Sequence, residues 1–376
     1  MDQSRSEKLK DIWWSIRSNR IVRPLALVAG GLVVVLIGLY IVLSYYGKLP
    51  WSTARVTVPD DLITNSTIPA AIDLNQQVPR ALDGVPVLLV DSDRFPLAVM
   101  IENLVTIRPQ AGLSAAGIVY EALAEGGITR FLAIYTTAEA IPTIGPIRSA
   151  RTYYVDWAEE YGGVFAYVGG SPEALGLTGS SDYLTDLNQF YNAQYYYRDE
   201  AIAAPHNLFS NSELFNYALR DLSVETTPGD FTTWTFKPEP PASELPDQVA
   251  PLTIAYSSDD YAVEWRYQAS SNTYLRWNGG VEHNDANTAE QLQAHNIIVQ
   301  RVATTLLEPA TGRLAMETLG QGEALLFQDG EVNVGRWLKN DRGQRTAFLD
   351  DTGAEWQYNP GTTWIEVVPT EISVTY

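Results

Sequence analysis

The sequence predicts an α+β protein in three parts: a single N-terminal transmembrane helix, an α/β-type domain with helices packed on a mixed sheet, and a mainly β C-terminal domain. Three patterns support this prediction. Residues 24–47 contain no charged side chain. Residues 92–222 alternate between strand and helix signals, which is typical of helices packed on a sheet. Residues 252–376 hold short strand signals separated by turns, which is typical of a β domain.

The apolar run at residues 24–47 is long enough to cross a membrane, because a rise of about 1.5 Å per residue covers a hydrocarbon core of roughly 30 Å. Basic residues precede it, and aromatic residues flank both ends, which places the N-terminus in the cytoplasm. These aromatics are Trp13, Trp14, Tyr45, Tyr46 and Trp51. A cleaved signal peptide is the alternative, but its apolar core is normally about 7–15 residues. We therefore expect a signal anchor in a single-pass cell-membrane protein, with residues 1–23 cytoplasmic and the later domains extracytoplasmic.

The net charge of −20 is unevenly spread over the 376 residues. Residues 1–23 hold six basic and three acidic side chains, which leaves 19 basic and 42 acidic residues in the remainder. Such an acidic surface repels nucleic acid, so we expect no nucleic-acid partner. The chain has no cysteine, which excludes disulfides, thiolate metal sites and a lipid anchor on an N-terminal cysteine.

Composition divides the chain beyond the predicted span. Residues 48–91 are rich in Thr, Pro, Asp and Asn and are predicted to be a stalk. Residues 92–222 are the first predicted domain. Residues 223–251 hold six prolines and are predicted to be a linker, with a short strand at 231–236. Residues 252–376 are the second predicted domain.

Strands and helices alternate in the first domain. Short apolar runs predict strands at 96–101, 130–136 and 164–168. Four helices are predicted from alanine-rich runs and capping residues: Ser114–Ala124 ending before two glycines, Ser149–Tyr161, a third starting at Pro172 with Ser171 as its cap, and a fourth after the capping box of Ser210 and Glu213.

The second domain is predicted to be mostly strands, with one short helix near Thr288–Leu292. Turn signals such as Asp329-Gly330 separate the strands. The predicted strands are 253–256, 261–267, 273–277, 296–302, 323–327, 331–338 and 363–368.

The segment Gly145–Arg151 is the first candidate site. It lies where a loop should enter a helix, and free backbone N–H groups there favour an anion. Arg148 and Arg151 are three residues apart and share a face if the helix has begun, with Ser149 between them. Two guanidiniums at a helix start suit phosphate or carboxylate. The alternative is that both arginines pair with nearby acids such as Glu121, Glu125 or Asp156.

Further candidates follow the first predicted strand. Glu102 and Asn103 end this strand, and Arg108 comes shortly after it; strand ends in α/β sheets commonly line ligand crevices. Glu121 and Glu125 share a face of the predicted helix, and with Glu102 they could hold a divalent cation such as Mg²⁺. Exposed helix carboxylates are the alternative, and Glu102 alone is the weak metal candidate.

Arg130 and His206 complete the candidates in this domain. Arg130 is either an anion ligand or part of an ion pair. His206, followed by Asn207, is either a general base or phosphate partner, or a structural histidine bonded to backbone. The catalytic candidates are thus Arg148, Arg151 and His206. Because no Walker A loop, Gly-x-Ser-x-Gly elbow or His-Glu-x-x-His motif occurs, the sequence leaves open whether the protein is an enzyme.

Two weaker patterns involve aromatic residues and a second histidine. Tyr191 and the run Tyr195–Tyr197 could stack on sugar rings, with packing as the alternative. His283, followed by Asn284 and Asp285, is a weak metal-binding pattern on a predicted turn.

Eight segments carry a family resemblance: PLAVMIEN (96–103), RPQAGLS (108–114), IVYEALAEGGITRF (118–131), IGPIRSAR (144–151), GGSPEAL (169–175), APHNLF (204–209), HNIIVQ (295–300) and PGTTWIEVVP (360–369). Together they resemble the YerB-like family of bacterial envelope proteins, whose N- and C-terminal domains (domain of unknown function 3048) would cover about residues 94–376. The resemblance implies a place in the cell envelope. Members are often lipoproteins, whereas this chain is expected to use residues 24–47 as its anchor.

The order of strands, arginines and glycines is also similar to the LytR-CpsA-Psr phosphotransferases, which move wall polymers from a polyprenyl-pyrophosphate lipid. This likeness implies that Arg148 and Arg151 hold the pyrophosphate and that Glu102 helps to place Mg²⁺. Those enzymes usually have an aspartate at that strand end, so Glu102 departs from their pattern.

Three functions are consistent with these residues. The first is an extracytoplasmic protein that binds an anionic envelope precursor, such as a glycan or lipid-linked precursor, or an envelope assembly protein. The second is a metal-dependent phosphotransferase or phosphohydrolase acting on polyprenyl-pyrophosphate-linked wall polymers. The third is a purely structural envelope protein.

Overall fold

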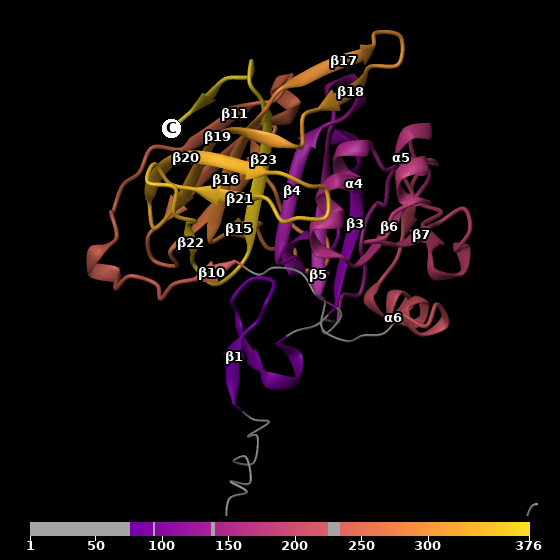
Figure 1. Ribbon diagram of the computed structural model, residues 1–376, viewed down its shortest axis with the longest axis horizontal. Coiled ribbons are helices and arrows are strands. Elements are labelled where there is room, and N and C mark those ends of the chain that lie inside the picture. The colour runs from indigo at the N-terminus through magenta and orange to yellow at the C-terminus, as the bar shows by residue number, and fades with distance from the viewer. Residues whose placement is uncertain (1–75, 93–94, 137–139, 225–233) are drawn as a thin grey trace, which may run out of the picture. The chain divides into compact units, whose positions relative to one another are not determined.

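A computed structural model describes residues 76–92, 95–136, 140–224 and 234–376 (Figure 1). The predicted cytoplasmic tail, the membrane span at 24–47 and residues 48–75 of the stalk lie outside the described residues. Within the described ranges, no helix combines the length and apolar character needed to span a bilayer. The described end of the stalk forms a hairpin, in which β1 (Gln77–Pro79) pairs antiparallel with β2 (Pro86–Leu88).

A ten-stranded mixed sheet organises the fold. From one edge to the other its strands are β21 (Ala347–Leu349), β20 (Glu331–Lys339), β19 (Gly320–Gln328), β16 (Asn296–Val302), β23 (Thr363–Pro369), β4 (Ile118–Leu123), β5 (Thr129–Thr136), β3 (Pro96–Glu102), β6 (Val164–Tyr167) and β7 (Thr185–Asn188). In the middle, β23 runs parallel to β4, with Ile365 opposite Tyr120. Strands of both predicted domains therefore share one sheet, as Figure 1 shows, and the domain boundaries stay predictions.

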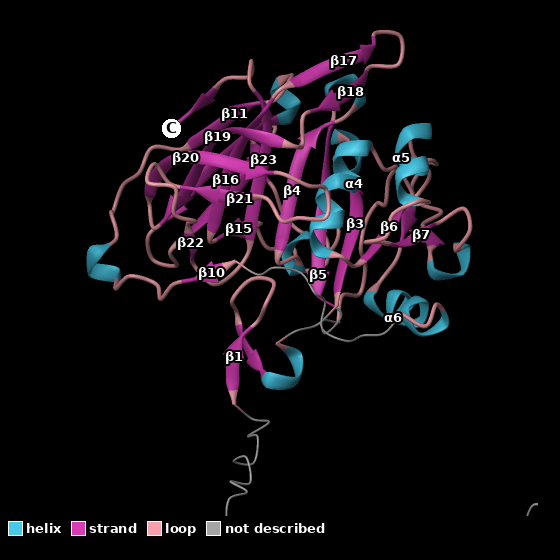
Figure 2. Cartoon of the chain, in the orientation of Figure 1, coloured by secondary structure: helices cyan, strands magenta, loops and turns pink. Residues whose placement is uncertain are grey.

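Buried apolar runs explain the centre of this sheet. Every residue of β3, β4 and β5 is buried, which is typical of strands covered on both faces. On one face, α4 (Thr152–Ala158) lies over β4 (Figure 2). The ring of Trp157 stacks on Tyr120 with centroids 5.4 Å apart. The hydroxyls of Tyr153 and Tyr154 donate to backbone carbonyls of the same strand. These bonds pair the two buried tyrosine hydroxyls beneath the helix.

A second sheet packs beside the first. Its strands are β14 (Val281–Glu282), β13 (Thr273–Asn278), β12 (Ala262–Gln268), β11 (Leu252–Ala255) and β24 (Val374–Thr375), with β15 (Gln293–Ala294) also paired to β13. Trp265 of β12 meets Trp364 of β23 edge to face, with centroids 5.2 Å apart. This aromatic contact joins the two sheets through a shared core.

Smaller elements connect the sheets. The paired short strands are β8 (Tyr197–Arg198) with β9 (Leu208–Phe209), β10 (Thr235–Phe236) with β22 (Gln357–Tyr358), and β17 (Thr304–Glu308) with β18 (Arg313–Met316). Within the described ranges, the other α-helices are α5 (Pro172–Thr178) and α6 (Ser212–Asp221). Single 3-10 turns are η1 (Leu89–Asp91), η2 (Val105–Ile107), η3 (Leu113–Ala115), η4 (Glu125–Gly127), η5 (Glu159–Tyr161), η6 (Ala193–Tyr195), η7 (Ala242–Glu244) and η8 (Asp259–Tyr261).

The structure confirms a mixed α+β protein that is mostly β with few helices. All seven strands predicted for the second domain are present, with ends shifted by up to three residues. The cap of α5 is also as predicted, because Ser171 Oγ accepts from Ala174 N at 3.2 Å. For α6 the helix is correct but the cap is wrong. Asn211 Oδ1 accepts from Leu214 N, whereas the Ser210 hydroxyl is buried and donates to Tyr195 O.

Two predicted helices are wrong. Ser114–Ala124 contains the strand β4 instead, because its apolar run from Ile118 is buried on both faces, which outweighs the helix propensity of its alanines. Gly126 and Gly127, both at positive φ, form the turn into β5. Near Thr288–Leu292 the chain makes a turn, in which the Asp285 carboxylate accepts from Asn287 N at 2.8 Å.

Candidate functional site

Three arginines lie near the point where β3 ends and β5 begins. Glu102, the last residue of β3, lies opposite Arg130 of β5 in the antiparallel register. The segment 144–151 crosses beside them and brings Arg148 and Arg151. We call Arg130, Arg148 and Arg151, with Glu102, Glu125 and His206, the arginine cluster.

The segment that carries Arg148 is extended, which corrects the prediction of a helix start. Arg148 N donates to Met100 O and Ala150 N donates to Gly169 O, both at 3.0 Å. Both hydrogen bonds go to neighbouring segments and not to a preceding turn of a helix. The backbone N–H groups are therefore paired in the way that those of a β-strand are. The helix α4 begins only at Thr152, with Arg151 as its cap residue. Arg148 and Arg151 therefore do not share a helix face, although both belong to the cluster.

Glu102 joins two partners, an arginine and a histidine. Its Oε1 lies 3.0 Å from Arg148 Nε, and its Oε2 lies 2.9 Å from His206 Nδ1. The carboxylate is nearly buried, whereas the side chains of Arg148 and His206 are 18% and 27% exposed. When Nδ1 of a histidine donates to a carboxylate, its Nε2 is left as an acceptor. His206 is thus held by a side chain, and not by backbone as the structural alternative predicted.

Glu125 joins the other two arginines. Arg151 Nε contacts its Oε1, and Arg130 Nη2 donates to its Oε2 at 3.2 Å. Burial alone would raise the pKa of Glu125, but the hydrogen bond from Arg151 and the charge of Arg130 outweigh it and hold that pKa below its usual value. Three guanidiniums thus share two carboxylates, which leaves the cluster with an excess of positive charge in an acidic protein.

Several predicted site residues have other roles. Ser149 contributes only its backbone oxygen, which accepts from Arg130 Nη1 at 3.1 Å. Asn207 holds the β8–β9 hairpin, where its Oδ1 accepts from Arg198 at 2.7 Å. Of the acids named as alternative partners, Glu125 does pair with Arg151, whereas Asp156 pairs with Arg342.

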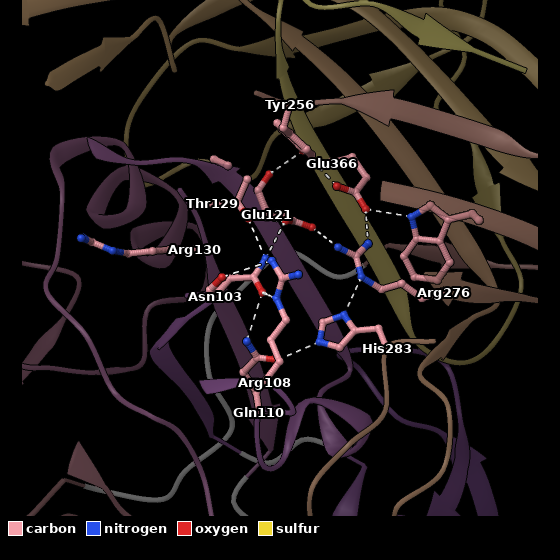
Figure 3. A network of polar contacts seen from close by, with 12 residues as sticks. Asn103, Arg108, Gln110, Glu121, Thr129, Arg130, Tyr256, Arg276, His283 and Glu366 are labelled. Carbon is pink, nitrogen blue, oxygen red and sulfur yellow. Dashed lines mark hydrogen bonds and ion pairs between the residues drawn. The ribbon is translucent and has the colours of Figure 1, made fainter. Parts of the chain in front are cut away.

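Glu121 lies in a separate buried network, shown in Figure 3, and Arg130 points away from this network. Because Glu121 is on β4, it does not share a helix face with Glu125. Its carboxylate pairs with Arg276 of β13, and Arg276 Nη1 also contacts Glu366 of β23 at 2.7 Å. All three side chains are fully buried. Burial, together with the charge of Glu366, raises the pKa of Glu121 to about 7 despite the opposing charge of Arg276.

Neutral side chains extend the network towards Arg108. Arg276 Nε donates to His283 Nδ1 at 3.0 Å, and His283 Nε2 then donates to Gln110 Oε1 at 2.7 Å. Burial and the charge of Arg276 lower the pKa of His283 well below its usual value, so the ring is neutral. Asn103 completes the chain of contacts, since its Oδ1 accepts from Arg108 Nε at 2.9 Å.

The metal candidates do not come together. Glu102, Glu121 and Glu125 each pair with different cations, and both ring nitrogens of His283 are engaged. Asp285 instead accepts from the backbone N–H groups of Gly112 and Ser114. Across the ranges that the structure describes, no three His, Asp or Glu side chains are grouped to hold a metal ion.

Sequence reasoning missed Arg276, Glu366 and Phe190. A lone charged residue inside an apolar strand pattern was the available signal for Arg276 and Glu366. Of the aromatic candidates, Tyr195 and Tyr196 are buried, whereas Tyr191 is 81% exposed. Phe190, next to Tyr191, is also exposed, and its ring packs over Gly169. The carbonyl of Gly169 accepts from the backbone N–H of Ala150, which lies in the segment 144–151.

Comparison with known proteins places these observations among relatives. Residues 84–225 match the family model described as "Protein of unknown function (DUF3048) N-terminal domain", and residues 252–365 match the corresponding C-terminal domain. The protein named "Putative lipoprotein YerB" of Bacillus subtilis is 32% identical over 308 residues, which are 80% of this chain and 89% of that protein. The crystal structure of the Bacillus subtilis YerB protein matches with a TM-score of 0.70 at 28% identity, covering 80% of this chain and 100% of that one.

Proposed function

This chain belongs to the DUF3048 family, together with YerB, and from that premise we propose that it is an extracytoplasmic protein of the bacterial cell envelope that binds an anionic envelope precursor. The lipoprotein name of the relative supports attachment to a membrane from outside the cytoplasm. In this chain the apolar run at 24–47 takes the place of the lipid, as a single-pass anchor with a cytoplasmic N-terminus.

The convergence of three arginines on two carboxylates carries the binding proposal. The overall charge of −20 would repel an anion, so a local excess of positive charge is what an anionic ligand needs. Guanidinium groups bind phosphate and carboxylate through paired N–H donors. The cluster lies at the carboxyl end of β3, beside the ends of the parallel strands β6 and β7, where α/β sheets commonly bind ligands.

Binding of polyprenyl pyrophosphate to the full chain in detergent micelles, with and without Mg²⁺, tests this proposal. The Arg148→Ala/Arg151→Ala variant should bind at least about tenfold more weakly, since a hydrogen bond to a charged group contributes about 1.5–3 kcal/mol. Arg313→Ala is the matched control, because Arg313 is a partly exposed arginine paired with Glu173 and Glu308 elsewhere. Equal affinity in the double variant and the control would contradict the site. No binding by the wild type would favour an assembly protein as partner or a structural role.

A second candidate function is phosphoryl transfer or hydrolysis, and the contact between Glu102 and His206 favours it. A carboxylate that holds Nδ1 of a histidine leaves Nε2 able to take a proton. An Mg²⁺ ion at Glu102 would have to compete with Arg148 and His206 for the carboxylate oxygens. Metal-dependent phosphate release from the pyrophosphate lipid, abolished in His206→Gln, would support this function. Binding without any turnover would contradict it.

A further inference from the structure

Lys237 and Asn359 lie side by side, each directly after one of two paired strands. β10 pairs parallel with β22, with Phe236 opposite Tyr358. Lys237 N donates to Tyr358 O at 2.9 Å, so the two chains stay together one residue further. Lys237 Nζ then donates to Asn359 Oδ1 at 2.7 Å. An amine and a carboxamide from residues 122 positions apart are therefore held in contact.

Asp329, in the turn between β19 and β20, contacts both nitrogen atoms of this pair. Its Oδ2 accepts from Lys237 Nζ at 2.6 Å, and its Oδ1 accepts from Asn359 Nδ2 at 2.7 Å. Asn272 Nδ2 donates to the same Oδ1 at 2.8 Å. Burial would raise the pKa of Asp329, but these hydrogen bonds outweigh it and hold that pKa below its usual value, so the carboxylate is ionised. One carboxylate thus bridges the amine and the amide nitrogen, where it can carry a proton between them.

The surroundings of the amide exclude most water. Asn359 is 0% exposed, and the side chains of Asp329 and Lys237 are 16% and 23% exposed. Trp234 and Tyr358 are both buried beside them, with ring centroids 4.7 Å apart. Exclusion of water limits hydrolysis as a side reaction and strengthens the electrostatic contacts. Because a carbonyl bond is about 1.23 Å long, Cγ of Asn359 lies within about 4 Å of Lys237 Nζ, close to the roughly 3–3.5 Å of a near-attack arrangement.

We propose that Lys237 and Asn359 form an intramolecular isopeptide bond, with Asp329 as the proton carrier. The Asp329 carboxylate takes one proton from the Lys237 ammonium, and the neutral amine attacks Cγ of Asn359. The Nζ–Cγ bond forms and the Cγ–Nδ2 bond breaks, while Asp329 passes its proton to Nδ2. The released ammonia takes the second proton from Nζ and leaves as ammonium. An ammonium and a carboxamide thus become a secondary amide and an ammonium ion, without any oxidant or other reactant.

Such a bond would replace the disulfides that this chain cannot form, because it has no cysteine. It would join the predicted linker at 223–251 to the residue that follows β22, and so close a loop containing most of the second predicted domain. A cross-link over a long loop stabilises a fold mainly by restricting the unfolded chain. The cross-link does not depend on the anionic ligand proposed above.

Mass spectrometry of the full chain, purified in micelles and then denatured, tests this bond. Wild type should be lighter than its sequence mass by one ammonia. Trypsin should release residues 221–266 joined to residues 346–376. The branched peptide is the decisive signal, because a succinimide at Asn278-Gly279 would also lose ammonia without joining two peptides. An intact mass equal to the sequence mass, with two separate peptides, would overturn the proposal.

Two variants and an internal control make the test specific. Asp329→Asn keeps hydrogen-bonding groups but cannot carry the proton, so the cross-linked fraction should form at least about a hundredfold more slowly. Lys237→Met removes the amine and should give no branched peptide, and it carries the comparison if Asp329→Asn fails to fold. Lys339 contacts Glu160 and the backbone of Asp156, with no asparagine among its described partners, so its peptides should stay unbranched. Undiminished cross-linking in Asp329→Asn that circular dichroism shows to be folded, or in Lys237→Met, would refute this site.

Discussion

The two ionic clusters of this protein use the same side chains in different surroundings. Arg276 lies between Glu121 and Glu366 with no exposure, and Trp364 and Trp265 cover it at 4.2 and 4.9 Å from the guanidinium. Arg148 and Arg151 pair with Glu102 and Glu125 but keep partial contact with solvent. Burial makes the first cluster a structural joint between β13, β4 and β23, whereas access leaves the second cluster able to exchange partners. Exposure, rather than residue type, separates the two roles.

The largest effect is expected at the buried joint. Arg276→Met removes the only cation between two buried carboxylates in the described network, so the free energy of unfolding should fall by about 3–5 kcal/mol. Urea unfolding followed by tryptophan fluorescence measures this change. Arg266→Met, at a half-exposed arginine paired with Glu264, should cost about 1 kcal/mol or less. Equal losses in both variants would remove the distinction between buried and exposed pairs.

Glu121 should make the joint sensitive to pH. Burial raises the pKa of this carboxyl to about 7, against 4.5 ordinarily, so the folded protein holds the proton more tightly than the unfolded chain. The stability from this proton is present below about pH 4.5 and is lost as the pH rises through about 7, by at most about 1.4 kcal/mol per pH unit. Urea midpoints of wild type should therefore fall with rising pH relative to Glu121→Gln. Parallel pH profiles would mean that Arg276 keeps Glu121 ionised throughout.

A smaller loss of stability is expected at the arginine cluster. Arg148→Ala should lower the free energy of unfolding by about 1 kcal/mol, because the pair with Glu102 is partly screened by water. The same change should weaken pyrophosphate binding by about tenfold. Thermal melts and lipid binding on one preparation separate the two effects. A loss of stability as large as that of Arg276→Met, without a change in binding, would make the cluster a second structural joint.

The smallest effect on stability is expected at Tyr191. This side chain is 81% exposed, so Tyr191→Ser should change the free energy of unfolding by less than about 0.5 kcal/mol. If the ring stacks on a sugar, the variant should bind a glycosylated pyrophosphate lipid more weakly while its affinity for the bare pyrophosphate lipid is unchanged. Equal affinity for both lipids in wild type and variant would leave Tyr191 without a part in binding.

The sequence predicts the strands of the second predicted domain well because the information that marks them is local. Alternating side chains and turns such as Asp329-Gly330 mark each strand within a few residues. The sequence-based prediction fails at β4. Its alanines and glutamates favour a helix locally, but burial between β5 and β23 makes the segment a strand. At the candidate site, the strand end at Glu102 and the segment with Arg148 could be predicted. The pairing of Glu102 with Arg148 and His206, and that of Arg276 with Glu366, depend on contacts 46 to 104 residues apart along the chain, which no local pattern encodes.

The pairing of β23 with β4 has a consequence for how the protein is made. The strand at residues 363–369 fills the place between β16 and β4, about 245 residues after its neighbour in the sheet. A ribosome delivers the N-terminal strands first, so until residues 363–369 have been synthesised β4 has a bare edge of unpaired backbone groups. Such an edge invites pairing with other chains. Completion of the sheet must therefore wait for residues 363–369, and a product truncated before them would be exposed to aggregation or proteolysis.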